Sequence, residues 1–364
     1  PSTHPHILTS ISPSSISWIG SIQAFLLLFI SALTGPLFDA GYFRHLLGTG
    51  SFLIVFGMMM TSVASEYWQV VLAQAVCVGL GAGCLFVPGV SILPTYFSGR
   101  KAVATGVATS GSSLGGILYP IIFYKLEPRI GFGWATRVIA FIAFATLSIS
   151  AAVMRVRVLP PAKRRLFLLS AWKDPPYTLF TLGLVCSFVG FYFPMFYIQS
   201  FAITKHITDA SLGFYLLVIL NAASLFGRIV PNLLADRYGP LNVIAPAAVI
   251  AAVLAFAWMG IRSTGGLVVF AVLYGFSSGC FVSIPPTVIV TLTKNMSEIG
   301  TRIGMNVAAA GFGVLIGNPI AGHLVQKNGF EAGMAFCAAI VAVGALLMVV
   351  ARFAKTGYRV RVIA

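Results

Sequence analysis

Apolar stretches of about twenty residues recur along the whole chain, punctuated by glycine, proline and charged residues. A helix of about twenty apolar residues crosses the hydrocarbon core of a bilayer, and a helix satisfies its own backbone hydrogen bonds there. The pattern therefore predicts an all-α polytopic membrane protein with eleven spans. The predicted spans cover residues 17–38, 46–65, 69–93, 102–124, 132–154, 177–203, 211–235, 241–261, 266–292, 301–325 and 331–353.

One long polar break divides these spans into five and six. It covers residues 155–176, where four prolines stand among six basic side chains, namely Arg155, Arg157, Lys163, Arg164, Arg165 and Lys173. We expect an N-terminal helix bundle over residues 1–154, a cytoplasmic linker over 155–176, and a C-terminal six-helix bundle with a cytoplasmic tail over 177–364.

Composition agrees with the membrane prediction and gives an orientation. The chain is 58% hydrophobic and 9% charged, with a mean hydropathy of +0.96, far from the usual composition of soluble chains. Most of the 23 Lys and Arg fall in segments on the linker's side of the membrane, which predicts that this side is cytoplasmic. The net charge of +15 is scattered through short loops without an aromatic-interleaved patch, so nucleic acid is excluded as a partner.

The two groups of spans show an internal repeat. Asp39 follows the first visible span and Asp236 follows the seventh, 197 residues later, while Pro120 and Pro319 are 199 residues apart. Transporters are commonly built from repeated helix bundles, so we expect two equivalent six-helix halves. The first half shows only five spans, and the symmetry predicts that its first helix is missing before residue 17.

The segment after the seventh span carries a recognisable signature. Residues 232–239 read Asn-Leu-Leu-Ala-Asp-Arg-Tyr-Gly, which resembles the G-x3-D-R-x-G loop of the major facilitator superfamily; the first copy has Ala40 where the basic residue is usual. The resemblance implies a major-facilitator-type two-bundle fold and a latch that locks one bundle orientation. The alternative is a set of solvated loop charges. The candidate latch residues are Asp39, Asp236, Arg237 and Gly239.

A second, more specific resemblance covers residues 96–115. It matches the monocarboxylate-porter signature in register at Tyr-Phe, at the basic pair and at the spaced Ala and Gly residues. The general pattern of the whole sequence is similar to fungal members of that family. Independently of the family, Gly106, Gly111 and Gly115 lie on a small-residue run along which two helices could pack closely. A rocking surface and static close packing are both open.

Arg228 is the candidate substrate-binding residue. It lies eight positions before Asp236, or about 12 Å inside the helix end at 1.5 Å per residue, and at that depth a charge should avoid lipid. None of the eight acidic residues is expected near mid-membrane, so the guanidinium lacks an obvious counter-ion. An unpaired guanidinium facing an aqueous cavity suits a carboxylate, which it can bind in bidentate fashion.

The surroundings of Arg228 in the sequence refine this hypothesis. Asn221, about two turns earlier, shares its helical face and joins it as a candidate substrate-binding residue. Arg228 matches the arginine that anchors carboxylates in monocarboxylate porters, whereas Ser224 stands where animal members carry an aspartate tied to proton coupling. The resemblance thus implies anion recognition but not proton symport. In the alternative, Arg228 tethers backbone carbonyls or the Asp236 loop.

No metal-ligand cluster, nucleophile elbow or phosphate-binding loop stands in the sequence, so we expect neither an enzyme nor a cofactor. We expect instead a secondary active transporter that moves a small organic solute, a monocarboxylate or another organic anion, by alternating access. Its partners would be that solute and the lipid bilayer, with the plasma membrane as its location. The alternative is a transport-inactive truncated carrier or a membrane scaffold or sensor.

Overall fold

The computed structural model describes residues 13–97, 101–157, 165–295 and 298–357, so Lys163 and Arg164 of the linker lie outside it. Every regular element among the described residues is a helix. The first half contains α1 (Pro13–Asp39), α2 (Phe43–Thr61), α3 (Tyr67–Val70), the π-type turns of η1 (Val71–Val78), α4 (Gly79–Ser91), α5 (Leu93–Tyr96) and α6 (Lys101–Val153).

The second half begins after a short 3-10 segment in the linker, η2 (Leu169–Lys173). Its helices are α7 (Pro175–Phe191), α8 (Phe193–Thr204), α9 (Ala210–Tyr238), α10 (Pro240–Trp258), α11 (Thr264–Ser283), α12 (Pro285–Leu292), α13 (Ile299–Asn328) and α14 (Phe330–Thr356). Prolines occupy first-turn positions of α7, α8, α10 and α12, where the missing N–H has no intrahelical partner to lose.

The predicted eleven-span, all-helical membrane fold is confirmed. Among the described residues, ten helical stretches are long and apolar enough to cross a bilayer, and one of them, residues 103–153, is long enough for two spans. The third predicted span is continuous through α3, η1 and α4. The sixth is α7 with α8, which meet at Tyr192 just before Pro194.

The structure differs from the prediction between the fourth and fifth spans, where we expected a loop over residues 125–131. The helix instead continues to residue 130, and a single non-helical residue, Gly131 (φ 76°, ψ 164°), turns α6 back on itself. Such a positive φ is strained for other residues but costs glycine little. Gly329 makes the same reversal between α13 and α14 at φ 86°, 198 residues later, which is the offset of the internal repeat.

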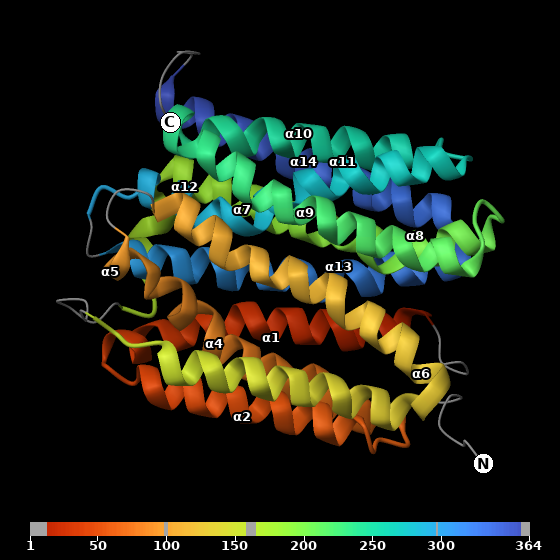
Figure 1. The fold of residues 1–364 in the computed structure, drawn as a ribbon. Helices are drawn as coiled ribbons and strands as arrows, with labels where there is room; N and C mark the ends of the chain where they lie inside the picture. The colour runs from red at the N-terminus through yellow and green to blue at the C-terminus, as the bar shows by residue number, and fades with distance from the viewer. Residues whose placement is uncertain (1–12, 98–100, 158–164, 296–297, 358–364) are drawn as a thin grey trace.

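The two halves lie against each other as two groups of roughly parallel rods (Figure 1). Two antiparallel helix pairs join them, α1 with α13 and the first limb of α6 with α9. The second limb of α6 folds back into the first half and packs on α2. Both seams therefore use one long helix from each half.

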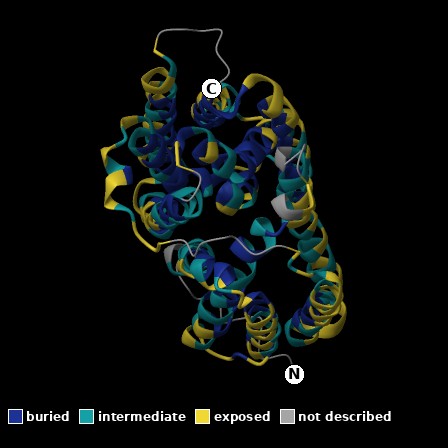
Figure 2. Ribbon diagram, turned by 90° about the vertical axis from the view of Figure 1, so that its left-hand side faces the viewer, coloured by how far each residue is buried: buried dark blue, intermediate teal, exposed yellow. Residues whose placement is uncertain are grey.

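Burial is uneven between the halves (Figure 2). One large cluster of buried apolar residues occupies the second half, whereas the first half contains two small clusters. In the second half α7 packs on both α13 and α14. Among the described residues, no helix packs against the two limbs of α6 in the way that α7 packs against α13 and α14. The first helix that the symmetry predicts for this place stays a prediction.

The described parts of the linker are held at both ends. Tyr96 Oη donates to the carbonyl of Arg155 at 2.6 Å in the first half. On the second half, Arg302 forms an ion pair with Asp174 at 2.8 Å, and Thr301 Oγ1 donates to the carbonyl of Arg165 at 2.7 Å. The linker is thus anchored on each half next to the seam.

Candidate functional site

A cavity of about 540 Å³ lies between the two halves at the end that carries the linker. Both halves build its wall, with α1, α4 and α6 on one side and α9, α11, α12 and α13 on the other. The described lining residues are Ser31, Ala32, Gly35, Phe38, Phe86, Val87, Val90, Ser91, Thr105, Thr109, Asp236, Val282, Pro286, Thr287, Val290, Ile299, Gly300, Ile303, Gly304 and Val307.

The cavity wall is mainly apolar. The ring of Phe86 and several branched aliphatic side chains face the space, Phe38 borders it with its ring packed on Phe43, and the polar side chains of the wall are hydroxyls apart from one carboxylate. That carboxylate belongs to Asp236, the charged side chain within the described lining. The sequence reasoning named Asp236 but missed the rings and hydroxyls, because nothing in a single apolar span indicates which of its faces meets the other half.

Arg228 lies directly behind this wall. Its side chain is only 8% exposed, and its Nη1 donates to the backbone carbonyl of Thr109 and to Ser112 Oγ, both on α6. Thr109 itself lines the cavity, whereas Arg228 is absent from the described lining. Nε of Arg228 is buried without a hydrogen-bond partner. The guanidinium therefore links the two halves in this conformation. It contacts Thr109, which lines the cavity, but does not belong to the described lining itself.

The backbone of α9 at Arg228 is in close contact with α6. A Cβ atom added to Gly106 would lie 2.5 Å from the carbonyl oxygen of Arg228. The same carbonyl accepts from Asn232 Nδ2 at 2.6 Å, and Nδ2 also donates to Ser283 Oγ at 2.8 Å. Any side chain at position 106 would push the two helices apart.

The other two predicted packing glycines lie away from this seam. A Cβ on Gly111 would meet nothing within 4 Å, and one on Gly115 would reach only the ring of Tyr119 on its own helix, at 3.6 Å. The second close approach is made by Gly116, where a Cβ would lie 2.5 Å from Asn221 Oδ1. The contact face of α6 is therefore rotated from the one chosen by the Gly-x3-Gly spacing.

Asn221 also belongs to the seam and not to the described cavity lining. Its Nδ2 donates to the carbonyl of Leu217 at 3.0 Å within α9. One turn further, Ser224 faces Ser113 of α6 with 3.5 Å between the hydroxyl oxygens. Asn221, Ser224 and Arg228 thus form a polar strip along α9 that packs against α6.

Of the four candidate latch residues, Asp39 lies at the end of α1 and the other three lie at the end of α9. Asp39 is 6% exposed at the end of α1. Asp236 is exposed, lines the cavity, and accepts a hydrogen bond from the backbone N–H of Val103 in the first turn of α6. A carboxylate at a helix N-terminus is stabilised by the helix dipole.

The other two candidate latch residues, Arg237 and Gly239, lie at the turn after α9. Gly239 adopts φ 95° and reverses the chain into α10, as the signature glycine should. The guanidinium of Arg237 lies 5.5 Å from the ring centre of the neighbouring Tyr238. Gly239 therefore makes the turn and Arg237 lies in the last turn of α9, while Asp236 makes the contact with the other half.

The opposite end of the seam is closed by polar and aromatic contacts. Ser17 Oγ and Tyr197 Oη lie 2.6 Å apart, and Asn318 Nδ2 lies 3.4 Å from Ser21 Oγ. Between the other two seam helices, the rings of Tyr124 and Phe214 stack with centres 4.3 Å apart. The halves are therefore closed at the end far from the linker and leave a cavity at the linker end.

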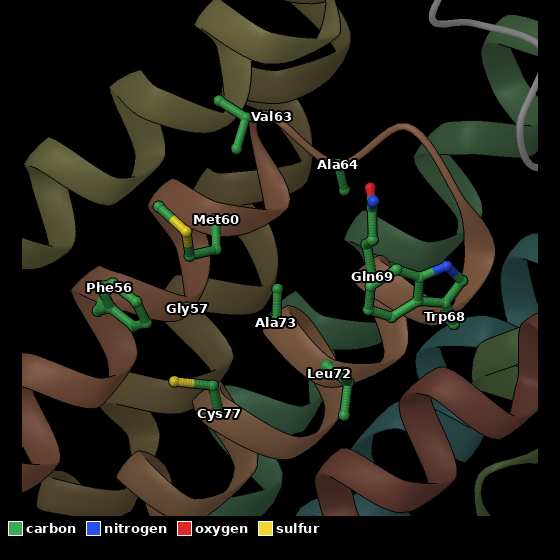
Figure 3. Close-up of a pocket in the computed structure, with 10 residues that line it drawn as sticks. All are labelled: Phe56, Gly57, Met60, Val63, Ala64, Trp68, Gln69, Leu72, Ala73 and Cys77. Atoms are coloured by element: carbon green, nitrogen blue, oxygen red, sulfur yellow. The ribbon is translucent and has the colours of Figure 1, made fainter.

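A second hollow, of about 350 Å³, lies between α2 and the α3–η1 segment (Figure 3). Its described lining comes from the first half alone, and several lining side chains, including Met60, Trp68 and Leu72, are exposed. A site that serves both sides of a membrane has to lie where the two halves meet, so the central cavity is the stronger candidate.

Two helix bundles around a cavity, embedded by long apolar helices, define a polytopic membrane transporter. A family model described as Major Facilitator Superfamily matches residues 2–267 and 182–363. The chain belongs to the major facilitator superfamily.

Curated relatives and a solved structure agree with this assignment. The chain is 51% identical over 317 residues to the MFS-type transporter dbaD of Emericella nidulans, covering 87% of this chain and 71% of that protein. It is 37% identical to the aspyridones efflux protein apdF of the same organism, covering 94% and 70%, and 33% identical to the agnestins efflux protein AgnL12 of Paecilomyces divaricatus, covering 97% and 82%.

The crystal structure of the E. coli fucose:proton symporter FucP has the same fold, with a TM-score of 0.68 at 17% identity, covering 93% of this chain and 91% of that one. These comparisons confirm the expected class, a membrane transporter and not an enzyme.

Proposed function

We propose that this protein exports a small organic solute by alternating access, as a secondary active transporter. The observation that carries the proposal is the central cavity, which both halves line at one end while contacts close the other end. Rocking of the halves about the α1–α13 and α6–α9 seams would exchange the open and closed ends. The efflux proteins among the relatives support the outward direction and a plasma-membrane location.

We further propose that the solute carries a carboxylate or a comparable anionic group that binds Arg228. The guanidinium is buried, has an unpartnered Nε, and forms no ion pair with any described residue. A buried charge without a counter-ion is costly, so an anion that reaches it would be held strongly. The monocarboxylate-porter resemblance of residues 96–115 supports the same chemistry.

In this scheme Arg228 can both bind the solute and hold α9 against α6. In this conformation Arg228 donates to Thr109 and Ser112 and holds α9 against α6. An anionic group entering at Thr109 would compete with these weaker, neutral acceptors for the guanidinium. Binding would then loosen the seam that has to rearrange during transport.

The proposed function is tested by blocking the cavity. Val87 lines the cavity, and Val107 is an exposed valine of α6 outside the described lining. We expect Val87→Trp to abolish most of the export of those members of a carboxylate panel (labelled butyrate, benzoate and pyrenebutyrate) that cells expressing the wild type export, and Val107→Trp to leave it intact. Equal export by both variants, at equal surface expression, would reject the cavity as the transport route. No export of any panel member by the wild type would favour the inactive scaffold.

A further inference from the structure

The size of the central cavity restricts the solute. Its volume of about 540 Å³ falls in the range of pockets that hold drug-sized ligands. A carboxylate of three or four carbons would leave most of this space unfilled and would leave the apolar wall without contacts. The cavity is therefore matched to a much larger molecule.

The polar side chains of the described wall are five hydroxyls and one carboxylate, and two of the hydroxyls donate hydrogen bonds within the protein. Thr109 Oγ1 donates to the carbonyls of Thr105 and Gly106 in its own helix, at 2.9 and 3.1 Å. Ser31 Oγ donates to the carbonyl of Gly83 at 3.3 Å. A solute with many hydroxyls or amides would give up hydrogen bonds to water here and regain few, which disfavours sugars and peptides. The ring of Phe86 and the aliphatic side chains favour an apolar body.

Charge is also unequal along the length of the cavity. Asp236 stands at the linker end of α9 and Arg228 eight residues further in, about 12 Å away along the helix. An anion is repelled near Asp236 and attracted near the guanidinium behind Thr109. A bound acid would therefore point its head inward and leave its body against Phe86 and the aliphatic wall.

We propose that the solute is a bulky amphipathic organic acid, with an apolar, ring-containing body that fills the cavity and one acidic group directed toward Arg228. This inference rests on the proposed function, in that it takes the central cavity as the solute site. It assigns short monocarboxylates and polar solutes such as sugars to the molecules that the cavity rejects.

Three probes separate the contribution of the acidic group to binding from that of the apolar body. Butyrate has the acidic head alone, pyrenebutanol has the body with a neutral hydroxyl, and pyrenebutyrate has both. Binding to the folded state raises the thermal unfolding midpoint, Tm, of the purified full chain. Unfolding can be followed by maleimide labelling of Cys280 and Cys337, which are buried in the native state.

We expect pyrenebutyrate to raise Tm by a few degrees at saturation, pyrenebutanol by less, and butyrate not at all. The rise should vanish in Val87→Trp, persist in the control Val107→Trp, and fall to the pyrenebutanol level in Arg228→Ala. An equal or larger rise with butyrate, no rise with pyrenebutyrate, or a rise that survives Val87→Trp would each overturn the inference. Because the assay measures binding alone, a protein that binds pyrenebutyrate but exports nothing would refute the proposed function and leave the inference standing.

Discussion

At the scale of single residues, Arg228 carries the largest share of the argument. Its Nη1 hydrogen bonds go to a backbone carbonyl and to a serine hydroxyl, neither of which neutralises a positive charge. The depth of Arg228 was predictable from the sequence, because it is counted from the helix end at Asp236. Its partners were not, since Thr109 and Ser112 lie more than a hundred residues away and only the packing of the two halves brings them together.

Replacing Ser112 distinguishes a solute-binding role of Arg228 from a role in holding α9 against α6. If an anionic solute has to displace the Ser112 hydroxyl from Arg228, Ser112→Ala removes a competitor, and we expect KM for pyrenebutyrate export to fall up to about tenfold, since a hydrogen bond to a charged group contributes about 1.5 kcal/mol. Initial rates measured over a range of concentrations give KM. The control is Ser110→Ala, whose hydroxyl bonds only to the Val107 carbonyl of its own helix. A lower Tm with unchanged KM in Ser112→Ala would leave Arg228 with a tethering role alone.

At the scale of elements, the α6–α9 seam depends on close approaches at two glycines, of which the sequence pattern identified Gly106 but not Gly116. The Gly111–Gly115 spacing indicated one face of α6, but Gly106 and Gly116 make the close approaches. Spacing within one helix identifies a small-residue face only if the orientation of the partner helix is known. The turn at Gly131 was hidden for a related reason: the polar residues 125–130 suggested a loop, yet a glycine at positive φ reverses the chain in one residue and leaves them helical.

This seam predicts opposite effects for two glycine-to-alanine changes in the same helix. Gly106→Ala would place a Cβ 2.5 Å from the Arg228 carbonyl, and such overpacking costs about 1–3 kcal/mol, so Tm should fall. Gly111→Ala meets open space and gains about 0.5–1 kcal/mol from reduced backbone entropy, so Tm should stay or rise. Thermal unfolding of both variants in one detergent is the measurement. A similar Tm for the two would mean that α6 and α9 do not pack in this way.

At the scale of the whole molecule, the two halves are related by the repeat but differ in how they are packed. Gly41 and Gly239, like Gly131 and Gly329, are 198 residues apart and make equivalent turns, which the spacing of Asp39 and Asp236 had indicated. The number of spans was therefore readable from the sequence. The seams were not, because each joins side chains that are far apart in the sequence, such as Phe312 with the α1 rings and Ser224 with Ser113.

The contact of Asp236 with the start of α6 makes a final prediction about how the halves move. Its carboxylate holds the N-terminal end of α6 beside the cavity, and a charge at a helix N-terminus contributes about 0.3–1 kcal/mol. Asp236→Asn keeps the shape but removes the charge, so the linker end should open more often. A cysteine placed at the lining residue Thr287, in a variant whose five native cysteines are replaced by alanine, would report this opening.

We expect a charged maleimide applied from the linker side to label that cysteine about two to five times faster in Asp236→Asn, which corresponds to the same range of free energy. The control is Asp209→Asn at the far end of α9, where the carboxylate only caps its own helix at Leu212, 3.0 Å away. Faster labelling in both variants would indicate general loosening of α9. Unchanged labelling in Asp236→Asn would reduce Asp236 to a solvated charge, because a carboxylate that restrains the linker end has to change the accessibility of the cavity when it is neutralised.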